Sequence, residues 1–486
     1  MVERLRTNFY HFILYQLNHV VEFSLSFVLI AVSTRLLSPE EFGVLRNLQS
    51  LAMGLFLVFS LYIPANYISL YYDECKNTHA LATLTSTSIF LLIGLGALCV
   101  VPSIIAGSHL LNSLGANSPD LWLIISVLIP LSNALTAVSK VSRAYLTQTS
   151  ANVTINLVTI LGSITSFLVA LLCLLGFGLK EISFFYAGLS VSVLHAGIEC
   201  SILSRKKLLI RSFSWKHTKT FLKLSIPTLP LALSTWIYQW SDQIILAVYG
   251  GVGLSGKYGL AYKIAGVLDK ITLAWYVVVQ PILFGYLSEP SPARRQSLHN
   301  SLGAGLLVLL SAALGIMFFG DIILRFLAPS EYQLDPLILN ILVVAFVFFG
   351  VRKYLVAVFW FKKQMLNITL INGIIPAVLN LVLNLILVPL YFEYAAALTT
   401  LLAAATSLFL TQIVNARGKI EIFAPHSMLV TLAIVAIGVG VASMFPHPIP
   451  LAYSVAIYVT LVGASFVQLI MLSPKDNSTA HEHSNL

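Results

Sequence analysis

The chain is a succession of apolar runs, each about 20 residues or longer, which is the length a helix needs to cross a hydrocarbon core about 30 Å thick. Of its 486 residues, 58% are hydrophobic and only 10% are charged, whereas soluble domains carry roughly 25% charged residues. In lipid every backbone N–H and C=O needs an internal partner, and the short alternating segments of a transmembrane barrel are missing. The sequence therefore predicts an all-α integral membrane protein.

About fourteen transmembrane helices are predicted. Prolines inside several of them predict kinks or unwound turns, because proline removes a helical hydrogen bond; these are Pro64, Pro102, Pro130, Pro281 and Pro376. The predicted spans are residues 9–34, 44–71, 80–107, 120–146, 152–177, 181–203, 220–249, 257–287, 298–327, 335–361, 366–390, 394–415, 426–445 and 449–472.

Lysine and arginine are divided unevenly between the two sides of the predicted membrane. Of 28 such residues, nineteen lie in connections on the side of the N-terminus, five lie on the other side and four fall within spans. Basic residues are enriched in cytoplasmic connections, so both termini are predicted to be cytoplasmic. The net charge of +9 is attributed to this topology and not to nucleic-acid binding, because the chain has no basic domain.

Weak internal repeats indicate a duplication. The copies have the same orientation because six spans separate them, so we expect two pseudo-symmetric six-helix lobes around a central cavity. The matches are Gly43 with Gly256, Pro119 with Pro336, and Gln148 and Asn156 with Gln364 and Asn372, at offsets of 213 to 217 residues. The predicted organisation is an N-terminal lobe at 1–203, a basic cytoplasmic linker at 204–219, a C-terminal lobe at 220–415, two further helices at 416–472 and a polar tail at 473–486.

The basic linker has two interpretations: it lies on anionic lipid, or it only anchors the topology. The four cysteines are scattered without the spacing of a metal site or a disulfide framework, and we interpret them as core residues. No cleavable signal peptide is expected, because the apolar stretch after Arg4 and Arg6 is too long and lacks a cleavage site.

Several stretches resemble a known family, the bacterial polysaccharide-biosynthesis flippases, which are the O-antigen type of the MATE-like MOP superfamily. The similar stretches are 35–43, 221–230, 234–236, 240–242, 256–258, 379–384, 388–389 and 395–397. Where the family usually has glycine after the proline of the eleventh span, this chain has Phe392, Glu393 and Tyr394. We therefore expect a bulkier and more acidic turn at that position.

The resemblance implies a flippase that carries a polyprenyl-diphosphate-linked oligosaccharide, such as an O-antigen repeat unit, from the cytoplasmic to the outer leaflet of a bacterial inner membrane. It also implies membrane lipids, a polysaccharide polymerase and chain-length proteins as partners. Two complete lobes in one chain make a monomer sufficient, and no metal or other cofactor is expected, although a proton or sodium gradient can drive the transport.

Three alternatives were weighed against this function. A lipid II flippase belongs to the same superfamily and stays open. A drug or cation antiporter of the multidrug-extrusion branch is disfavoured, because it should have about twelve spans and an acidic cavity. An enzyme is disfavoured because the outer connections are short and no nucleophile–base or metal constellation is present.

Charges within the spans are the candidate functional residues, because a charge at the bilayer centre is costly unless it faces protein, water or a partner. Basic groups outnumber acidic ones, which favours an anion such as a diphosphate. The candidate substrate-binding residues are Lys263, Lys270, Arg352, Lys140, Arg143 and Arg35. The candidates for gating or ion coupling are Asp242, Asp269, Glu22 and His19.

Structural roles remain open for most of these residues. Lys140 and Arg143 are three residues apart and either contact substrate or snorkel to the membrane surface. Asp242 either gates the cavity or pairs with Lys263 or Lys270, which are seven residues apart and predicted to share a helix face.

Similar alternatives apply to three further positions. Glu22 and His19 form either a proton-coupling pair or a polar contact between helices. Arg35 either controls exit or binds headgroups. Arg352 is preferred over its neighbour Lys353 as a phosphate ligand, since adjacent residues point about 100° apart on a helix. Aromatic residues Trp236, Trp240, Tyr258 and Tyr262 either stack on sugars or pack between helices.

Overall fold

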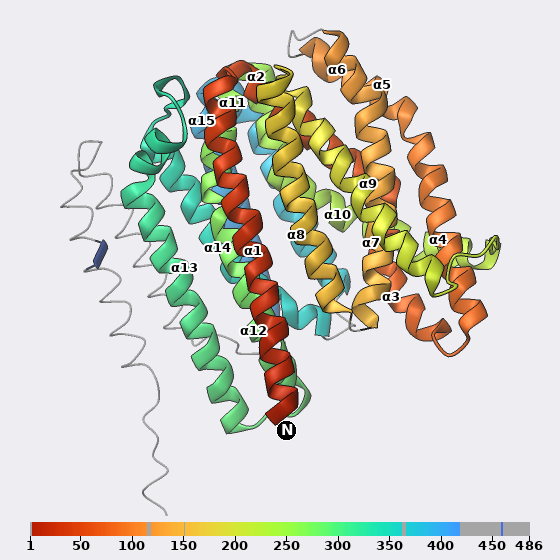
Figure 1. The fold of residues 1–486 in the computed structure, drawn as a ribbon. Coiled ribbons are helices and arrows are strands. Elements are labelled where there is room, and N and C mark those ends of the chain that lie inside the picture. Colours follow the sequence, from red (N-terminus) through yellow and green to blue (C-terminus); the bar gives the residue numbers. More distant parts are fainter. Residues whose placement is uncertain (1, 114–117, 150, 362–365, 418–457, 460–486) are drawn as a thin grey trace, which may run out of the picture. The chain divides into compact units, whose positions relative to one another are not determined.

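A computed structural model describes residues 2–113, 118–149, 151–361, 366–417 and 458–459, and these ranges contain helices but no β-strand (Figure 1). The predicted all-α fold is therefore confirmed. The elements are α1 (Val2–Leu36), α2 (Pro39–Ser60), α3 (Ile63–Glu74), α4 (Thr78–Leu98), α5 (Val100–Ser113), α6 (Pro119–Leu123), the π-helical turn η1 (Ile124–Leu128), α7 (Ile129–Gln148), α8 (Asn152–Leu171), the π-helical turn η2 (Leu172–Gly176), α9 (Ile182–Arg205), α10 (Trp215–Gly250), α11 (Val252–Ala265), α12 (Val267–Ser288), α13 (Pro292–Leu327), the 3₁₀ turn η3 (Ser330–Tyr332), α14 (Pro336–Phe361) and α15 (Leu366–Arg417).

Each of the first twelve predicted spans falls on one of these elements or on two or three consecutive ones. Among the described residues, nine helices are long and apolar enough to cross a membrane. The predicted spans 426–445 and 449–472 and the tail at 473–486 fall outside the described residues, apart from residues 458–459. The predicted linker at 204–219 is shorter than expected, because α10 already begins at Trp215.

The outer surface of α8 and of the turn η2 that follows it shows that lipid is the solvent of this segment. Six leucine and isoleucine side chains repeat along one face at intervals of three or four residues, which is one face of a helix, and each is between 40% and 63% exposed. Such a stripe would aggregate in water, whereas in a bilayer it contacts acyl chains. These residues are Leu157, Leu161, Ile164, Leu168, Leu172 and Leu175.

Interruptions of the helices occur close to several of the prolines. Leu61 and Tyr62 adopt left-handed backbone angles between α2 and α3, and Pro64 follows in the first turn of α3. The break between α4 and α5 precedes Pro102, and the π-helical turn η1 precedes Pro130. A proline cannot donate a helical hydrogen bond, so the preceding turn rearranges. By contrast, α12 continues through Pro281.

The turn inside α15 departs most from helical geometry. Phe392 has φ 46° and ψ −123°, so α15 is two helices joined at this residue. Few L-residues adopt these angles, and they cost about 1–3 kcal/mol in a non-glycine residue. The resemblance noted above puts glycine here in related proteins, and the structure shows the physical reason: the phenylalanine occupies a glycine conformation.

Residues in contact form two compact units, and each is described by itself. The first comprises residues 1–260, 325–334 and 373–403, and the second comprises 261–324, 335–372 and 404–486. In the first unit, α7 packs against α4, α3 and α9, and α8 packs between α9 and α1. In the second unit, α12 packs along α14. The predicted division into lobes at 1–203 and 220–415 stays a prediction.

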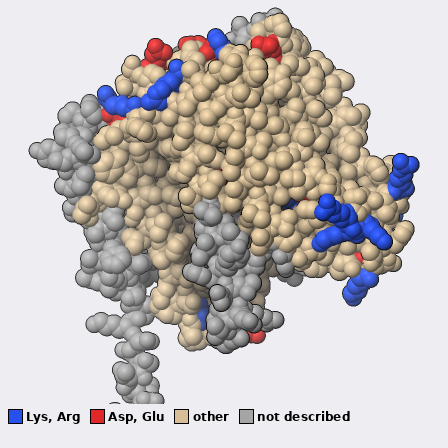
Figure 2. Space-filling model, in the orientation of Figure 1, with Lys and Arg blue, Asp and Glu red and all other residues tan. Residues whose placement is uncertain are grey.

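Uncharged atoms predominate on the visible surface, and the charged side chains gather in a few clusters (Figure 2). We name the two ends of the first unit after residues at helix termini. The Leu36 end is where α1 ends and α2 begins, and the Glu74 end is where α3 ends and α4 begins.

Candidate functional site

At the Leu36 end of the first unit, α2 and α11 cross at the two glycines that the internal repeat pairs. A β-carbon on Gly43 would lie 2.1 Å from the carbonyl oxygen of Val252. A β-carbon on Gly256 would lie 2.1 Å from the carbonyl oxygen of Pro39. Only glycine allows the two backbones to approach this closely. The crossing therefore closes this end through backbone contact (Figure 1).

Hydrogen bonds reinforce the same end. The hydroxyl of Thr34 donates to the carbonyl oxygen of Leu327 over 2.6 Å. The guanidinium of Arg35 donates to the carbonyl oxygens of Phe326 (2.8 Å) and Leu327 (3.2 Å). These carbonyls belong to the last turn of α13, which has no further helical N–H to satisfy them. Arg35 therefore acts as a cap on the last residues of α13.

An ion pair lies beside this closure. Ser38 and Glu41 form a reciprocal capping box at the start of α2, and the ammonium of Lys180 donates to the carboxylate of Glu41. That hydrogen bond raises the pKa of Lys180. The neighbouring Glu181 lies before α9, where burial raises the pKa of its carboxyl group.

Asp242 of α10 is the centre of a buried polar cluster in the first unit. Its side chain is 1% exposed. The hydroxyl of Tyr258 donates to Oδ2 over 2.7 Å, the hydroxyl of Thr400 donates to the same oxygen over 3.2 Å, and the backbone N–H of Gln243 donates to Oδ1. The cluster joins α10, α11 and α15. These hydrogen bonds to Asp242 thus come from hydroxyl and backbone groups of its own unit.

A second row of polar groups continues along α15. The hydroxyl of Thr399 donates to Oδ1 of Asn384 (2.7 Å), and the amide of Asn384 donates to Oδ1 of Asn380 (3.2 Å). All three side chains are fully buried. Together with the carboxylate of Asp242, these hydroxyl and carbonyl oxygens are the ligand type that hard cations prefer. The arrangement can therefore bind a small cation or a proton.

Arg143 of α7 belongs to a network that links three helices of the first unit. Its Nε donates to Oε1 of Glu199 (2.6 Å), and Ser139 donates to the other carboxylate oxygen (2.6 Å). Nη2 of Arg143 lies 2.8 Å from Nδ1 of His195, and Nη1 donates to Thr159 (3.2 Å). Because Glu199 is 1% exposed, Arg143 neutralises a buried carboxylate that would otherwise be costly.

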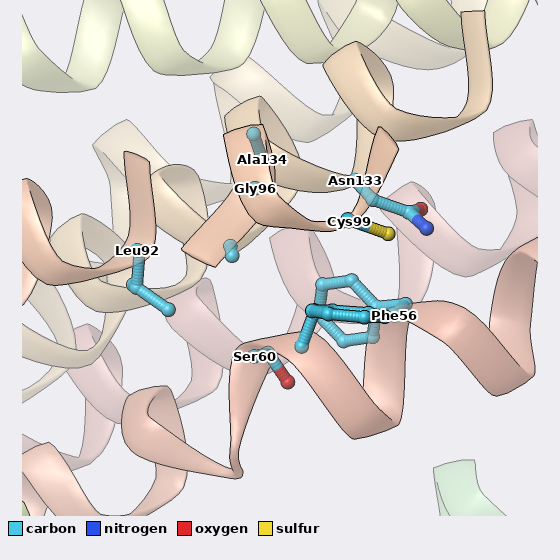
Figure 3. Close-up of a pocket in the computed structure, with 9 residues that line it drawn as sticks. Phe56, Ser60, Leu92, Gly96, Cys99, Asn133 and Ala134 are labelled. Carbon is cyan, nitrogen blue, oxygen red and sulfur yellow. The ribbon is translucent and has the colours of Figure 1, made fainter. Parts of the chain in front are cut away.

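Lys140 lies one turn before Arg143 and has a different environment. Its ammonium is 4.2 Å from the centre of the Phe56 ring, close enough for a cation–π interaction. Phe56 also lines a small pocket between α2, α4 and α7, with a volume of about 10 Å³ (Figure 3). This is room for about one water molecule. The pocket is therefore too small for a lipid-linked oligosaccharide, and it lies beside the helix breaks that follow Ser60 and Leu98.

The second unit contains most of the remaining basic candidates. Lys263 lies in the last turn of α11, Lys270 lies in the first turn of α12, and Arg352 lies on α14. Lys353 of α14 donates to Asp269 of α12 over 2.7 Å, with the two side chains 29% and 36% exposed. Asp269 therefore holds Lys353 in an ion pair. This pairing is consistent with the preference for Arg352 as the phosphate ligand.

The expectation that Lys263 and Lys270 share one helix face stays a prediction. The two lysines lie on either side of Gly266, the single residue between the end of α11 at Ala265 and the start of α12 at Val267. Lys270 is exposed and Lys263 is half-buried.

The remaining candidates lie on α1. Glu22 is half-buried, and the side chain of His19 is outside the described part of the structure. Of the aromatic residues, Trp236 donates from Nε1 to the carbonyl oxygen of Ser50 (2.9 Å), and Trp240 contacts the guanidinium of Arg46. These contacts are packing between helices of the first unit.

Sequence reasoning missed Glu199, His195 and Arg46. Glu199 and His195 are four residues apart within the predicted sixth span, so the rule applied to other intramembrane charges would have found them. Arg46 was assigned to an outer connection. It is 7% exposed and lies against α11, since a β-carbon on Gly259 would be 3.4 Å from its Cγ.

The apolar, lipid-facing helices define a polytopic membrane protein. Comparison with solved structures agrees. An inward-facing multidrug resistance MATE family transporter of the MOP superfamily superposes with a TM-score of 0.69 at 15% identity, covering 82% of this chain and 99% of that one. The lipid II flippase MurJ in an inward closed conformation superposes with a TM-score of 0.68 at 16% identity, covering 95% and 98%. At these identities the likeness shows the fold.

The model of the polysaccharide biosynthesis protein family matches residues 11–287, more than half of the chain, and the chain belongs to this family. It is 24% identical over 213 residues to the probable low-salt glycan biosynthesis flippase Agl15 of Haloferax volcanii. That match spans 42% of this chain and 43% of the relative, which is less than half of either. The predicted family, and the prediction of a transporter and not an enzyme, are confirmed.

Proposed function

We propose that this protein flips a polyprenyl-diphosphate-linked oligosaccharide from the cytoplasmic to the outer leaflet by alternating access. Family membership supports a lipid-linked glycan as substrate, since the relative from Haloferax volcanii is described as a glycan biosynthesis flippase. The positive-inside distribution of lysine and arginine supports placing the Glu74 end in the cytoplasm. The Leu36 end would then face outwards, and its closure would correspond to a state that accepts substrate from the cytoplasmic side.

The observation that carries the proposal is the charge along two packed helices of the second unit. Helices α12 and α14 pack against each other. Together they contain three basic residues, Lys270, Arg352 and Lys353, and a single carboxylate, Asp269. Lys263 at the end of α11 adds another positive charge. Such charges are costly within a membrane and mark functional sites. A cationic surplus suits a diphosphate, and an arginine can bind phosphate oxygens through two parallel hydrogen bonds.

Substitution of Arg352 tests this assignment. A hydrogen bond between charged groups contributes about 1.5–3 kcal/mol, so Arg352→Gln should lower transport by roughly ten- to 150-fold. The measurement is flipping of a polyprenyl-diphosphate sugar in proteoliposomes, at equal amounts of reconstituted protein. The matched control is Arg294→Gln, which removes an exposed arginine at the start of α13. Equal activity of Arg352→Gln and wild type would refute the role of Arg352.

A lipid II flippase is the second candidate. Superposition on MurJ over 95% of this chain supports it, and the same cationic surplus would suit the diphosphate of lipid II. The two substrates differ in the sugar, so transport of each in the same proteoliposomes separates them. Faster flipping of lipid II than of other polyprenyl-diphosphate sugars would replace the first proposal by the second.

We propose in addition that ion coupling uses the buried cluster at Asp242. A carboxylate with hydroxyl and amide oxygens on three helices can take up a cation or a proton, and occupancy would change how α10, α11 and α15 pack. Asp242→Asn should abolish the response of flipping to a proton or sodium gradient. Asp120→Asn, which alters an exposed carboxylate at the start of α6, is the control. Gradient-dependent transport by Asp242→Asn would refute the proposal.

A further inference from the structure

The connection between α9 and α10 carries a dense positive charge. From Arg205 to Lys223 the chain has seven lysines and arginines and no aspartate or glutamate. All seven side chains are exposed. In Figure 2 lysine and arginine side chains gather on the part of the visible face where Figure 1 draws this connection. The seven are Arg205, Lys206, Lys207, Arg211, Lys216, Lys219 and Lys223.

The chain leaves α9 through a defined helix end. The N–H of Lys207 donates to the carbonyl oxygen of Ser204 (2.9 Å), and the N–H of Leu208 donates to that of Leu203 (3.0 Å). Lys207 has φ 59°, and Leu203 and Leu208 are both buried. These features form a Schellman motif with its apolar contact. Lys207 is thereby fixed in the left-handed conformation at the surface.

Two residues of α4 then hold the connection. The hydroxyl of Ser86 donates to the carbonyl oxygen of Leu208 (3.2 Å) and accepts from the N–H of Ile210 (2.8 Å). The hydroxyl of Thr87 accepts from the N–H of Ser214 (2.9 Å). Ser86 and Thr87 are buried within the first unit. The backbone of the connection is therefore pinned to the protein at both of its ends.

Between these anchors the side chains alternate in exposure. Arg211, Phe213 and Trp215 are exposed, whereas Ser212 and Ser214 between them are half-buried. An extended chain places alternate residues on opposite faces, so one face presents arginine, phenylalanine and tryptophan together. Phe213 is 52% exposed and Trp215 is 61% exposed. Their ring centroids are 6.4 Å apart.

The first turns of α10 extend this face. Lys216, Lys219 and Lys223 follow at intervals of three and four residues, which places them on one side of the helix. His217 is not part of this side, because its Nε2 lies 3.1 Å from Oε1 of Glu74. We name the surface formed by Arg211, Phe213, Trp215, Lys216 and Lys219 the linker patch.

We propose that the linker patch is a binding site for anionic phospholipid headgroups of the leaflet at the Glu74 end. Exposed tryptophan and phenylalanine beside lysine and arginine are the combination that binds at a membrane interface, where the rings enter the headgroup region and the cations contact phosphate. On one side α9 is long and apolar enough to cross a membrane, and on the other α10 contains the predicted span 220–249, so we place the patch at the membrane surface. The pinned backbone holds these side chains in position before lipid binds, which lowers the entropic cost of binding.

This site goes beyond transport of the glycan substrate and does not depend on its identity. A basic connection that only fixes topology needs no exposed aromatic residues and no backbone pinned by buried hydroxyl groups. A lipid site uses both features. The inference is therefore that anionic lipid binds the segment that joins α9 to α10.

The test uses the full-length protein in nanodiscs of phosphatidylcholine that contain either brominated phosphatidylglycerol or brominated phosphatidylcholine at equal mole fraction. Bromine quenches tryptophan fluorescence on contact. Wild type should be quenched more strongly by the phosphatidylglycerol probe, and Trp215→Phe should lose that difference. Because each basic residue strengthens attraction to an anionic surface, Arg211→Gln/Lys216→Gln/Lys219→Gln should weaken the preference for phosphatidylglycerol by about tenfold or more.

Two controls keep the result interpretable. Arg294→Gln/Arg295→Gln removes exposed basic residues from another connection on the predicted cytoplasmic side and should keep the preference of the wild type. Arg211→Lys/Lys216→Arg/Lys219→Arg preserves the charges and should also keep it. Equal quenching of wild type by both probes, or an equal loss in the Arg294/Arg295 variant, would overturn the proposal.

Discussion

The glycine crossing at the Leu36 end gives the sharpest prediction. A β-carbon at Gly256 would lie 2.1 Å from the carbonyl oxygen of Pro39 and 3.0 Å from the backbone nitrogen of Gly43, whereas ordinary contacts begin at 3.4 Å. The obstructing atoms belong to the backbone, so no side chain can rotate away. In Gly256→Ala, α11 would have to move away from α2 by about 1.3 Å, the difference between 3.4 and 2.1 Å.

Overpacking of this kind costs about 1–3 kcal/mol. The cost falls on the closed arrangement, in which the two backbones touch, and disappears when α2 and α11 separate. Since 1.4 kcal/mol corresponds to a factor of ten in an equilibrium constant, Gly256→Ala should raise the population of the separated state by roughly five- to 150-fold. Gly43→Ala should act in the same direction, because its β-carbon would meet the carbonyl oxygen of Val252 at the same distance.

A reporter cysteine measures this population. Ser50 is fully buried on α2 and hydrogen-bonds to the backbone of Trp240. In a background without native cysteines, Ser50→Cys of the purified protein should react with a soluble maleimide at a rate that follows opening. Gly256→Ala should accelerate that reaction by the stated factor.

The control is Gly188→Ala, whose β-carbon would have no atom within 4 Å; it should leave the rate unchanged. The reasoning is refuted if Gly256→Ala and Gly43→Ala both react at the rate of the unaltered protein while thermal unfolding shows them folded.

Three further predictions concern stability and closure. Phe392→Gly should raise the melting temperature, because relief of about 1–3 kcal/mol of backbone strain exceeds the loss of a partly exposed ring; a lower melting temperature would contradict this. Arg143→Ala should destabilise the protein by about 3–5 kcal/mol in thermal unfolding, because Glu199 is left charged and buried, whereas Arg143→Met/Glu199→Leu should cost less; equal losses would count against an ion pair. Arg35→Ala should speed labelling of the reporter at Ser50, since the last carbonyls of α13 lose their cap, and Arg35→Lys should restore part of the closure; identical labelling of all three proteins would remove Arg35 from the closure.

The fold class was predictable because it depends on local properties. The length and apolarity of each run determine where a helix can cross a bilayer, and the prolines determine where several of these helices are interrupted. Pro64, Pro102 and Pro130 each follow a break or an irregular turn in the structure. The glycine at 43 and its counterpart at 256 were also visible as a repeat.

The environment of each charge was less predictable, because it depends on which helix faces meet. Arg143 forms an ion pair with the buried Glu199, and Lys353 forms one with Asp269. In both cases the two residues lie on different helices and are separated by 56 and 84 positions along the chain. Hydropathy and charge spacing within one helix cannot report such contacts.

The sequence by itself determined that this chain is a multi-span helical membrane protein, because backbone groups in lipid must be satisfied internally and the apolar runs have the length of spanning helices. The tertiary structure decided what its polar residues do. It brought Gly43 against α11, surrounded Asp242 with hydroxyl groups and pinned the basic connection to α4. Each of these outcomes depends on packing between helices distant in sequence, and the strength of an electrostatic contact depends on distances that only this packing sets.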